Sequence, residues 1–274
     1  MALGGNPVFR GKNFRGAVAT APPIPPAPFG QPSMTAEQLD ELYRQPSAGP
    51  AQTGRLTYDD VIVKTLACLA VVVIGAAVTM TMPPAPRLGL MVIGALGGFV
   101  LGLVNTFKRE PVPALILAYA ALEGLFLGGL TALVDRVGQG LGLQAVVGTF
   151  AVAGVTLFLY RSGKVRATPK LARFFLIAMG GYLAFSVVNL FLMLFGVVQN
   201  PWGLRSGLLG IAIGLVAVVL AAISLIFDFN SVEEAVRAGA PRRVAWTAAF
   251  GLTVTLVWLY TEILRLLAIF NSSD

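Results

Sequence analysis

The chain lacks histidine altogether and has a single cysteine, Cys68, among its 274 residues. Without histidine there can be no Ser-His-Asp triad, no imidazole pH switch and few kinds of zinc site. One cysteine cannot form a disulfide within the chain. Any proton chemistry in this protein must therefore rest on carboxylates.

Charge is also scarce, because only 12% of the residues are charged whereas 56% are apolar. A soluble domain usually carries about 25% charged residues, so the composition predicts a protein whose solvent is mostly lipid. The net charge of +7 would suggest nucleic acid as a partner of a soluble protein. Here the basic residues lie between apolar runs, which favours topology signals and contacts with anionic lipid headgroups, and no nucleic acid partner.

Residues 1–56 form a separate zone rich in proline, glycine, alanine, serine and glutamine. The zone lacks apolar periodicity and cannot bury enough surface to fold, so we expect a disordered tail. A short helix is expected at 35–44, where Thr35 and Gln38 resemble a capping box. The zone has no short apolar stretch followed by a small-residue cleavage site, which excludes a signal peptide.

Residues 57–274 are a series of long apolar runs separated by proline and glycine. A membrane-spanning helix needs about 20 such residues. The sequence therefore predicts an all-α integral membrane protein with seven spans, at about 62–82, 88–106, 112–134, 142–160, 171–195, 207–227 and 244–270. Six spans with a re-entrant seventh segment is the competing topology.

Basic residues are distributed very unevenly between the two sides of these spans. Fourteen lysines and arginines lie in the N-terminal tail and the even-numbered loops, against Arg87, Arg136 and Arg205 on the other side. The positive-inside rule then predicts a cytoplasmic N-terminus. We expect a multi-pass protein of the bacterial inner membrane.

Glycines recur at helical spacing in several spans, as at 94, 98 and 102, at 124 and 128, and at 210 and 214. Faces of small residues let helix backbones approach closely in lipid, so we interpret these faces as packing surfaces. No internal repeat is visible, and an inverted-repeat transporter is therefore not supported.

Glu123 is the most conspicuous ionisable residue within a span. If the third span starts near residue 112, Glu123 lies about 17 Å along it, close to the bilayer midplane. An ionised acid there costs about 2.5 kcal/mol or more, so Glu123 must be protonated, paired or facing a polar cavity. It is either a proton- or cation-sensing acid on an ion pathway, or a neutral acid bonded to a neighbouring helix.

Three further ionisable residues lie towards the C-terminus. Glu262 and Arg265 are three residues apart on one helical face, where they form either a local ion pair or, for Glu262, half of an interhelical acid pair with Arg265 as its counter-ion. Asp228 is expected at the inner edge of the sixth span, at the start of a cytoplasmic loop. It is either an ordinary acid at a helix end or an acid with a specific role.

No motif in the chain favours catalysis. There is no Walker loop, no HExxH and no GxSxG sequence. We expect neither an enzyme nor a bound cofactor.

The chain resembles the Bax inhibitor-1/YccA family, also called the transmembrane Bax inhibitor motif family, in its actinobacterial-type branch. The resemblance rests on six stretches that run from one end of the chain to the other: 6–9 (NPVF), 56–65 (LTYDDVIVKT), 122–128 (LEGLFLG), 227–229 (FDF), 239–241 (GAP) and 249–267 (AFGLTVTLVWLYTEILRLL). Together these stretches are specific, whereas each alone is weak.

The resemblance implies a bundle in which six helices surround a central C-terminal seventh. It also implies a pH-sensitive calcium leak, with a pair of acids on the sixth and seventh helices as gate and sensor. Once ionised, such a pair can bind calcium through its oxygen atoms. Asp228 matches the sixth-helix acid, and Glu262 is the nearest match to the seventh. Their separation of 34 residues is long for such a pair, and on a seventh span starting at 244 they could meet only if a helical extension preceded it. Glu123 with Glu262 is the alternative pair.

Two functions from different classes follow. One is a cation leak gated by intramembrane carboxylates at Glu123, Asp228 and Glu262, because two acids that share a proton titrate as a unit and can bind a divalent cation once ionised. The other is an interaction protein without transport, because the same family includes members that restrain a membrane protease. The tail at 1–56 could then bind a membrane-protein partner.

Overall fold

The computed structural model of the chain describes residues 54–108, 110–200 and 202–272. The short helix expected at 35–44, and the tail up to residue 53, lie outside this part. The described residues form seven long helices and no strand. All seven are long and apolar enough to cross a membrane. The expected all-α membrane fold is confirmed.

The helices begin and end where the sequence places its caps and prolines. Their bounds are α5 (Tyr58–Thr81), α6 (Pro84–Phe107), α7 (Pro113–Val134), α8 (Leu141–Arg161), α9 (Pro169–Leu194), α10 (Gly207–Arg237) and α11 (Val244–Asn271). Thr57 caps α5 by accepting a bond from the Asp60 backbone N–H. Proline opens α6, α7 and α9, where its missing N–H costs nothing.

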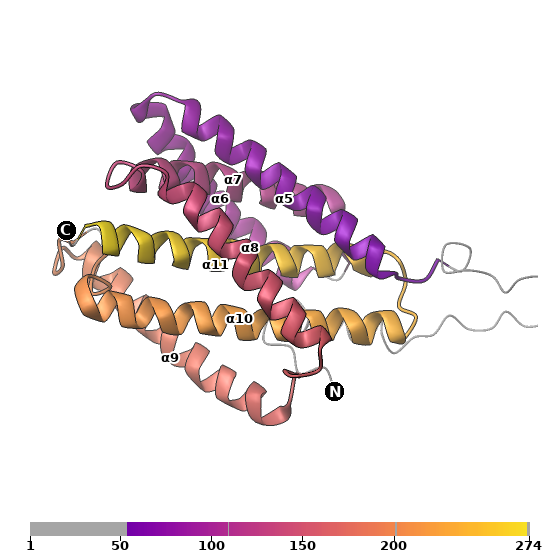
Figure 1. Cartoon of the computed structure of the whole chain (residues 1–274). Helices are drawn as coiled ribbons and strands as arrows, with labels where there is room; N and C mark the ends of the chain where they lie inside the picture. Colours follow the sequence, from indigo (N-terminus) through magenta and orange to yellow (C-terminus); the bar gives the residue numbers. More distant parts are fainter. Residues whose placement is uncertain (1–53, 109, 201, 273–274) are drawn as a thin grey trace, which may run out of the picture.

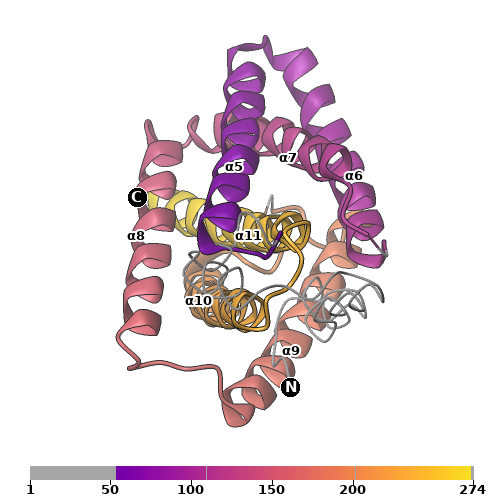
Figure 2. The same cartoon turned by 90° about the vertical axis from the view of Figure 1, so that its right-hand side faces the viewer.

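Consecutive helices run in opposite directions, as Figure 1 shows. The bundle thus has a near end, where α5, α7, α9 and α11 begin, and a far end, where α6, α8 and α10 begin. The last helix, α11, lies in the middle with the others around it (Figure 2). It is also the most buried of the seven helices, with 61% of its most apolar stretch enclosed. Because α11 is one continuous helix of 28 residues, the competing topology with a re-entrant seventh segment does not form.

Glycine faces bring α5, α6 and α7 into close contact. A Cβ at Gly124 would lie 3.0 Å from the Cα of Gly75, and one at Gly94 would lie 2.6 Å from the backbone nitrogen of Phe126. Such spacing leaves no room for any side chain at either position. The packing role predicted for these faces fits the structure.

At the near end, the segment before α5 is attached to the loop between α10 and α11. The Leu56 N–H donates to the Ala240 carbonyl at 2.7 Å, and the Arg242 N–H donates to Gly54 at 2.9 Å. The Arg242 guanidinium also pairs with Asp60 at 2.6 Å. This loop is therefore short and well bonded, and α11 begins directly after it at Val244.

One expected boundary is wrong, because α10 does not end at residue 227 but continues to Arg237. Residues 228–237 contain no glycine or proline that would stop it. Their polar side chains bond along the helix, from Asn230 to Glu234 at 2.8 Å and from Arg237 to Glu233. The helix stops where Gly239 takes a positive φ of 63°.

Candidate functional site: two buried acids beside the central helix

Asp228 lies inside α10, nine residues before its end, and its exposed fraction is 0%. The expectation that it starts a cytoplasmic loop is therefore wrong, for the reason given above. Its carboxylate accepts a hydrogen bond of 2.6 Å from the hydroxyl of Thr255 on α11. Thr255 is itself 2% exposed. An acid on the sixth membrane helix thus meets a hydroxyl on the central helix.

Asp228 and Glu262 are not brought together. Thr255, the partner of Asp228, precedes Glu262 by seven residues, which is two helical turns or about 10 Å along α11. The helical extension that could have closed this distance is absent, because residues 238–243, directly before α11, are not helical. The two acids therefore cannot share a proton or jointly bind one cation.

Glu262 lies in the far half of α11 and is 3% exposed. Its carboxylate forms an ion pair with Arg265 one turn later, as expected from their spacing. The Tyr182 hydroxyl on α9 donates to the same carboxylate, and the Trp258 indole N–H donates to it at 3.3 Å. The acid is held by donors from two helices.

Arg205, in the loop before α10, completes the group around Glu262. Its guanidinium lies 4.0 Å from the Glu262 carboxylate and donates to the Tyr182 hydroxyl at 3.2 Å. It also donates to Ser186 and lies over the Tyr182 ring at 5.0 Å. The loop between α9 and α10 is thereby attached to the far half of the bundle core.

We call Glu262, Arg265, Arg205, Tyr182 and Trp258 the arginine cluster. It holds one carboxylate and two guanidinium groups, so its formal charge is positive. Both arginine side chains are at most 14% exposed. The Nε atoms of both arginines lack a hydrogen-bond partner among the described residues. The cluster is positively charged at a depth where charge is expensive.

Glu123 lies on α7, half-buried, and faces α6, where a Cβ at Gly98 would be 3.0 Å from its Oε1 atom. The Tyr119 hydroxyl, one turn earlier, is its hydrogen-bonding neighbour. Two contacts set the register of α7 on α11: the Tyr119 and Phe250 rings, 5.0 Å apart, and the Thr131 and Tyr260 hydroxyls, 2.7 Å apart.

That register places Glu123 beside the turn of α11 near Thr253, at about the same depth as Thr255. Glu262 lies nine residues beyond Thr253, which is roughly 13 Å along the axis. The alternative pair of Glu123 and Glu262 is thus not formed either. Each of the three predicted acids stands in its own surroundings.

Among the described residues, no group of three or more histidine, cysteine, aspartate or glutamate side chains could hold a metal ion. Cys68 is buried on α5 and interacts with Thr253 on α11. The Asp228 carboxylate and the Thr255 hydroxyl carry oxygen atoms of the kind that calcium prefers as ligands.

Four residues of these two sites were not predicted: Thr255, Arg205, Tyr182 and Trp258. Threonine, tyrosine and tryptophan are common within membrane spans, and their spacing gives no sign of a polar role. Arg205 did carry a signal, because it is one of only three basic residues outside the spans on its side of the chain. The position of Arg205 in the sequence indicates the topology of the spans, but it does not indicate that Arg205 approaches Glu262.

The fold and these sites define a multi-pass membrane bundle with buried acids on its central helix and on the helix packed against it. A model of the family described as Bax inhibitor 1 like matches residues 6–272, and the chain belongs to that family. The predicted membership is confirmed. Comparison with curated protein sequences gave no match.

Proposed function

We propose that this protein is a leak pathway for cations, with calcium as the transported ion, and that ionisation of Asp228 controls its opening. The observation that carries the proposal is the complete burial of Asp228 between α10 and the central helix. Placing an ionised aspartate in the middle of a membrane helix costs about 2.5–3.5 kcal/mol on insertion scales. The protonation of this acid therefore bears directly on how tightly the two helices pack.

A protonated Asp228 is neutral and fits the closed packing, where Thr255 donates to it. An ionised Asp228 requires water or a cation, which favours separation of α10 from α11. Rising pH then opens the pathway and falling pH closes it. This mechanism uses one acid and a hydroxyl, and it differs from the acid pair that the family resemblance implies.

The near end of α10 supports entry of cations. Ser231, one turn beyond Asp228, is fully buried and polar. Glu233 and Glu234 follow within the last two turns of the helix, bonded to Tyr160 and Asn230 respectively. Arg237 pairs with Glu233, so a cation that approaches Asp228 from this end meets the Glu234 carboxylate and the Ser231 hydroxyl, which lower its electrostatic cost.

The arginine cluster supports a closed far end. Two guanidinium groups against one carboxylate repel a cation that has reached the far half of α11. In this proposal Glu262 belongs to the barrier and is not a calcium ligand. Opening of this barrier requires Arg205 to move, because Arg205 lies in a loop whereas the other members of the cluster lie on helices.

The excess of basic residues at the near end supports placing that end in the cytoplasm of a bacterial cell and the far end outside its inner membrane. The basic loops between α6 and α7, between α8 and α9 and between α10 and α11 all lie at the near end. A leak that closes at low pH would then respond to the pH of the cytoplasm.

The test is calcium flux into liposomes that contain the full chain, measured against pH. Asp228→Asn should keep the shape of the side chain and remove the pH dependence of flux. The matched control is Asp59→Asn, which removes an exposed acid at the start of α5 and should leave the pH profile unchanged. An Asp228→Asn profile identical to that of the wild type would overturn the proposal.

The alternative function is that of an interaction protein that binds a membrane-protein partner without transport. It depends on residues 1–53, which lie outside the residues that the structure describes. A deletion that tests it should stop at residue 53, because 54–56 bond to the loop before α11. Lost capture of a membrane protease with unchanged calcium flux would favour that alternative.

A further inference from the structure

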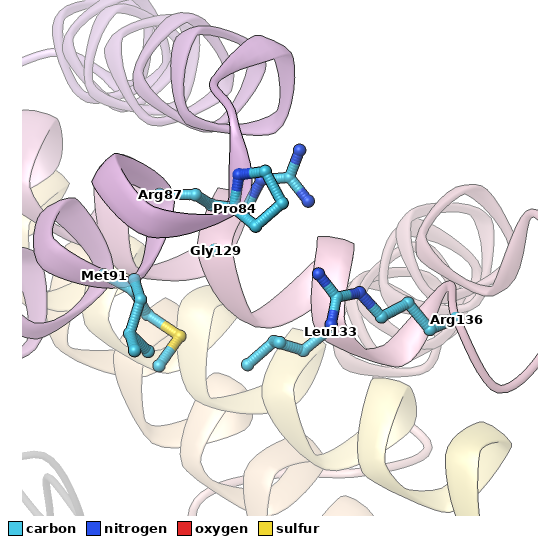
Figure 3. Close-up of a pocket in the computed structure, with 7 residues that line it drawn as sticks. Pro84, Arg87, Met91, Gly129, Leu133 and Arg136 are labelled. Carbon is cyan, nitrogen blue, oxygen red and sulfur yellow. The ribbon is translucent and has the colours of Figure 1, made fainter.

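The far end carries few basic residues, and two of them meet in one place. Arg87 lies in the first turn of α6, and Arg136 follows the end of α7. Both border a hollow with about 210 Å³ of empty space, part of which is open to the surroundings. Figure 3 shows Arg87 on α6 and Arg136 on the turn after α7, with Met91 and Leu133 near them.

Neither arginine has an ion-pair partner among residues 54–108, 110–200 and 202–272. Arg87 donates to the carbonyls of Met80 and Met82 at 3.0 and 2.6 Å, which holds its guanidinium in place but leaves its charge uncompensated. The nearest acid in sequence, Asp135, accepts a bond from the Gly142 N–H at 3.0 Å. The hollow is therefore bordered by two positive charges that form no ion pair within the part of the chain that the structure describes.

The rest of the hollow is apolar, with Leu88, Met91 and Leu133 among its lining residues. It continues onto the outer face of α6, where Leu88, Val92 and Leu96 are exposed at helical spacing. A small hydrated anion gains nothing from such a surface. A molecule with a phosphate at one end and a hydrocarbon chain at the other matches both parts.

We infer that this hollow binds the phosphate headgroup of an anionic membrane lipid, with one acyl chain along α6. Arg87 is fixed by the end of α5 through Nη2, and its other terminal nitrogen, Nη1, donates to no described residue and supplies a preorganised donor. Arg136 is exposed and supplies the second charge. A lipid held there would connect α6 to the end of α7, on the side of the bundle away from Asp228 and the proposed leak.

The test uses the full chain, purified in detergent and stripped of lipid. Binding of phosphatidylglycerol and of phosphatidylcholine with the same acyl chains is titrated by native mass spectrometry. Each arginine near a membrane surface contributes about a fivefold change in affinity, so Arg136→Gln should weaken phosphatidylglycerol binding about fivefold and the double change with Arg87→Gln about 25-fold. Phosphatidylcholine should bind weakly to every variant.

The matched control is Arg161→Gln, which removes an exposed charge at the near end of α8 and should leave binding unchanged. Equal loss in this control would mean general surface attraction and would overturn the inference. Undiminished binding by Arg136→Gln would do the same, and this exposed position carries the test if the double variant fails to fold. Displacement of the lipid by inorganic phosphate at equal concentration would show a site for a free anion instead.

Discussion

Asp228 lies on α10 against the central helix, whereas Glu262 lies on the central helix itself, and both are buried. Asp228 accepts a bond from the Thr255 hydroxyl, whereas Glu262 has two guanidinium groups within 4.0 Å in addition to the Tyr182 hydroxyl. A hydroxyl can donate to an ionised acid and can donate to or accept from a neutral one, so the contact with Thr255 does not hold Asp228 in one protonation state. Arginine stays charged at any physiological pH, so the cluster around Glu262 keeps its positive charge. The first arrangement suits a pH switch, and the second suits a barrier whose charge does not change with pH.

The comparison also separates function from stability. An acid that changes its charge cannot be the main support of the fold, because the fold would then change with pH. A buried group of fixed charges behaves differently, since removing one member strands the others. We therefore expect substitutions at the arginine cluster to act first on stability and substitutions at Asp228 to act first on pH response.

The largest effect should come from Glu262→Gln. It leaves two buried guanidinium groups without their carboxylate, which should cost about 3–5 kcal/mol in the free energy of unfolding. Unfolding in mixed micelles titrated with SDS measures it. The double change of Glu262 and Arg265 to glutamine should cost less than Glu262→Gln alone, and a larger cost would argue against a shared charge cluster.

A smaller effect is expected from Thr255→Val, which keeps the volume of the side chain and removes the donor to Asp228. Leaving that buried acceptor without its hydroxyl should cost about 1–3 kcal/mol. Thr149→Val is the control, because the buried Thr149 hydroxyl bonds only to the Ala145 carbonyl of its own helix among the described residues. Equal unfolding free energies for the two variants would show that the bond between Thr255 and Asp228 contributes no more than a bond within one helix.

The smallest effect should be that of Tyr182→Phe. Glu262 loses one donor and Arg205 loses one acceptor, but Glu262 keeps Trp258 and Arg265 and Arg205 keeps Ser186, so we expect a cost of about 1 kcal/mol in the same unfolding assay. A cost as large as that of Glu262→Gln would show that the hydroxyl, and not the charge balance, holds the cluster together.

Much of the fold was predictable, because spans of apolar residues bounded by proline are a strong signal. Six of the seven expected spans end within a few residues of the helices α5, α6, α7, α8, α9 and α11. The exception is α10, where the polar residues at 228–237 resemble a loop in composition. Hydrogen bonds along the helix, which composition does not reveal, keep these residues helical.

The candidate sites were predictable only in part. Scarcity of charge in the spans identified Asp228, Glu262, Arg265 and Glu123, and three-residue spacing identified the ion pair of Glu262 with Arg265. Which groups meet across helices depends on the register of one helix on another, and a single sequence does not contain that register. The contact of Asp228 with Thr255 and the approach of Arg205 to Glu262 both arise from it.

The most direct measurement compares the pH dependence of calcium flux in liposomes for two variants. One is Asp228→Asn, and the other is the double change of Glu262 and Arg265 to glutamine. The account predicts a flat profile for Asp228→Asn and a profile that still rises with pH for the double variant. A pH response that survives in Asp228→Asn and disappears in the double variant would contradict it, and would place the sensor in the arginine cluster.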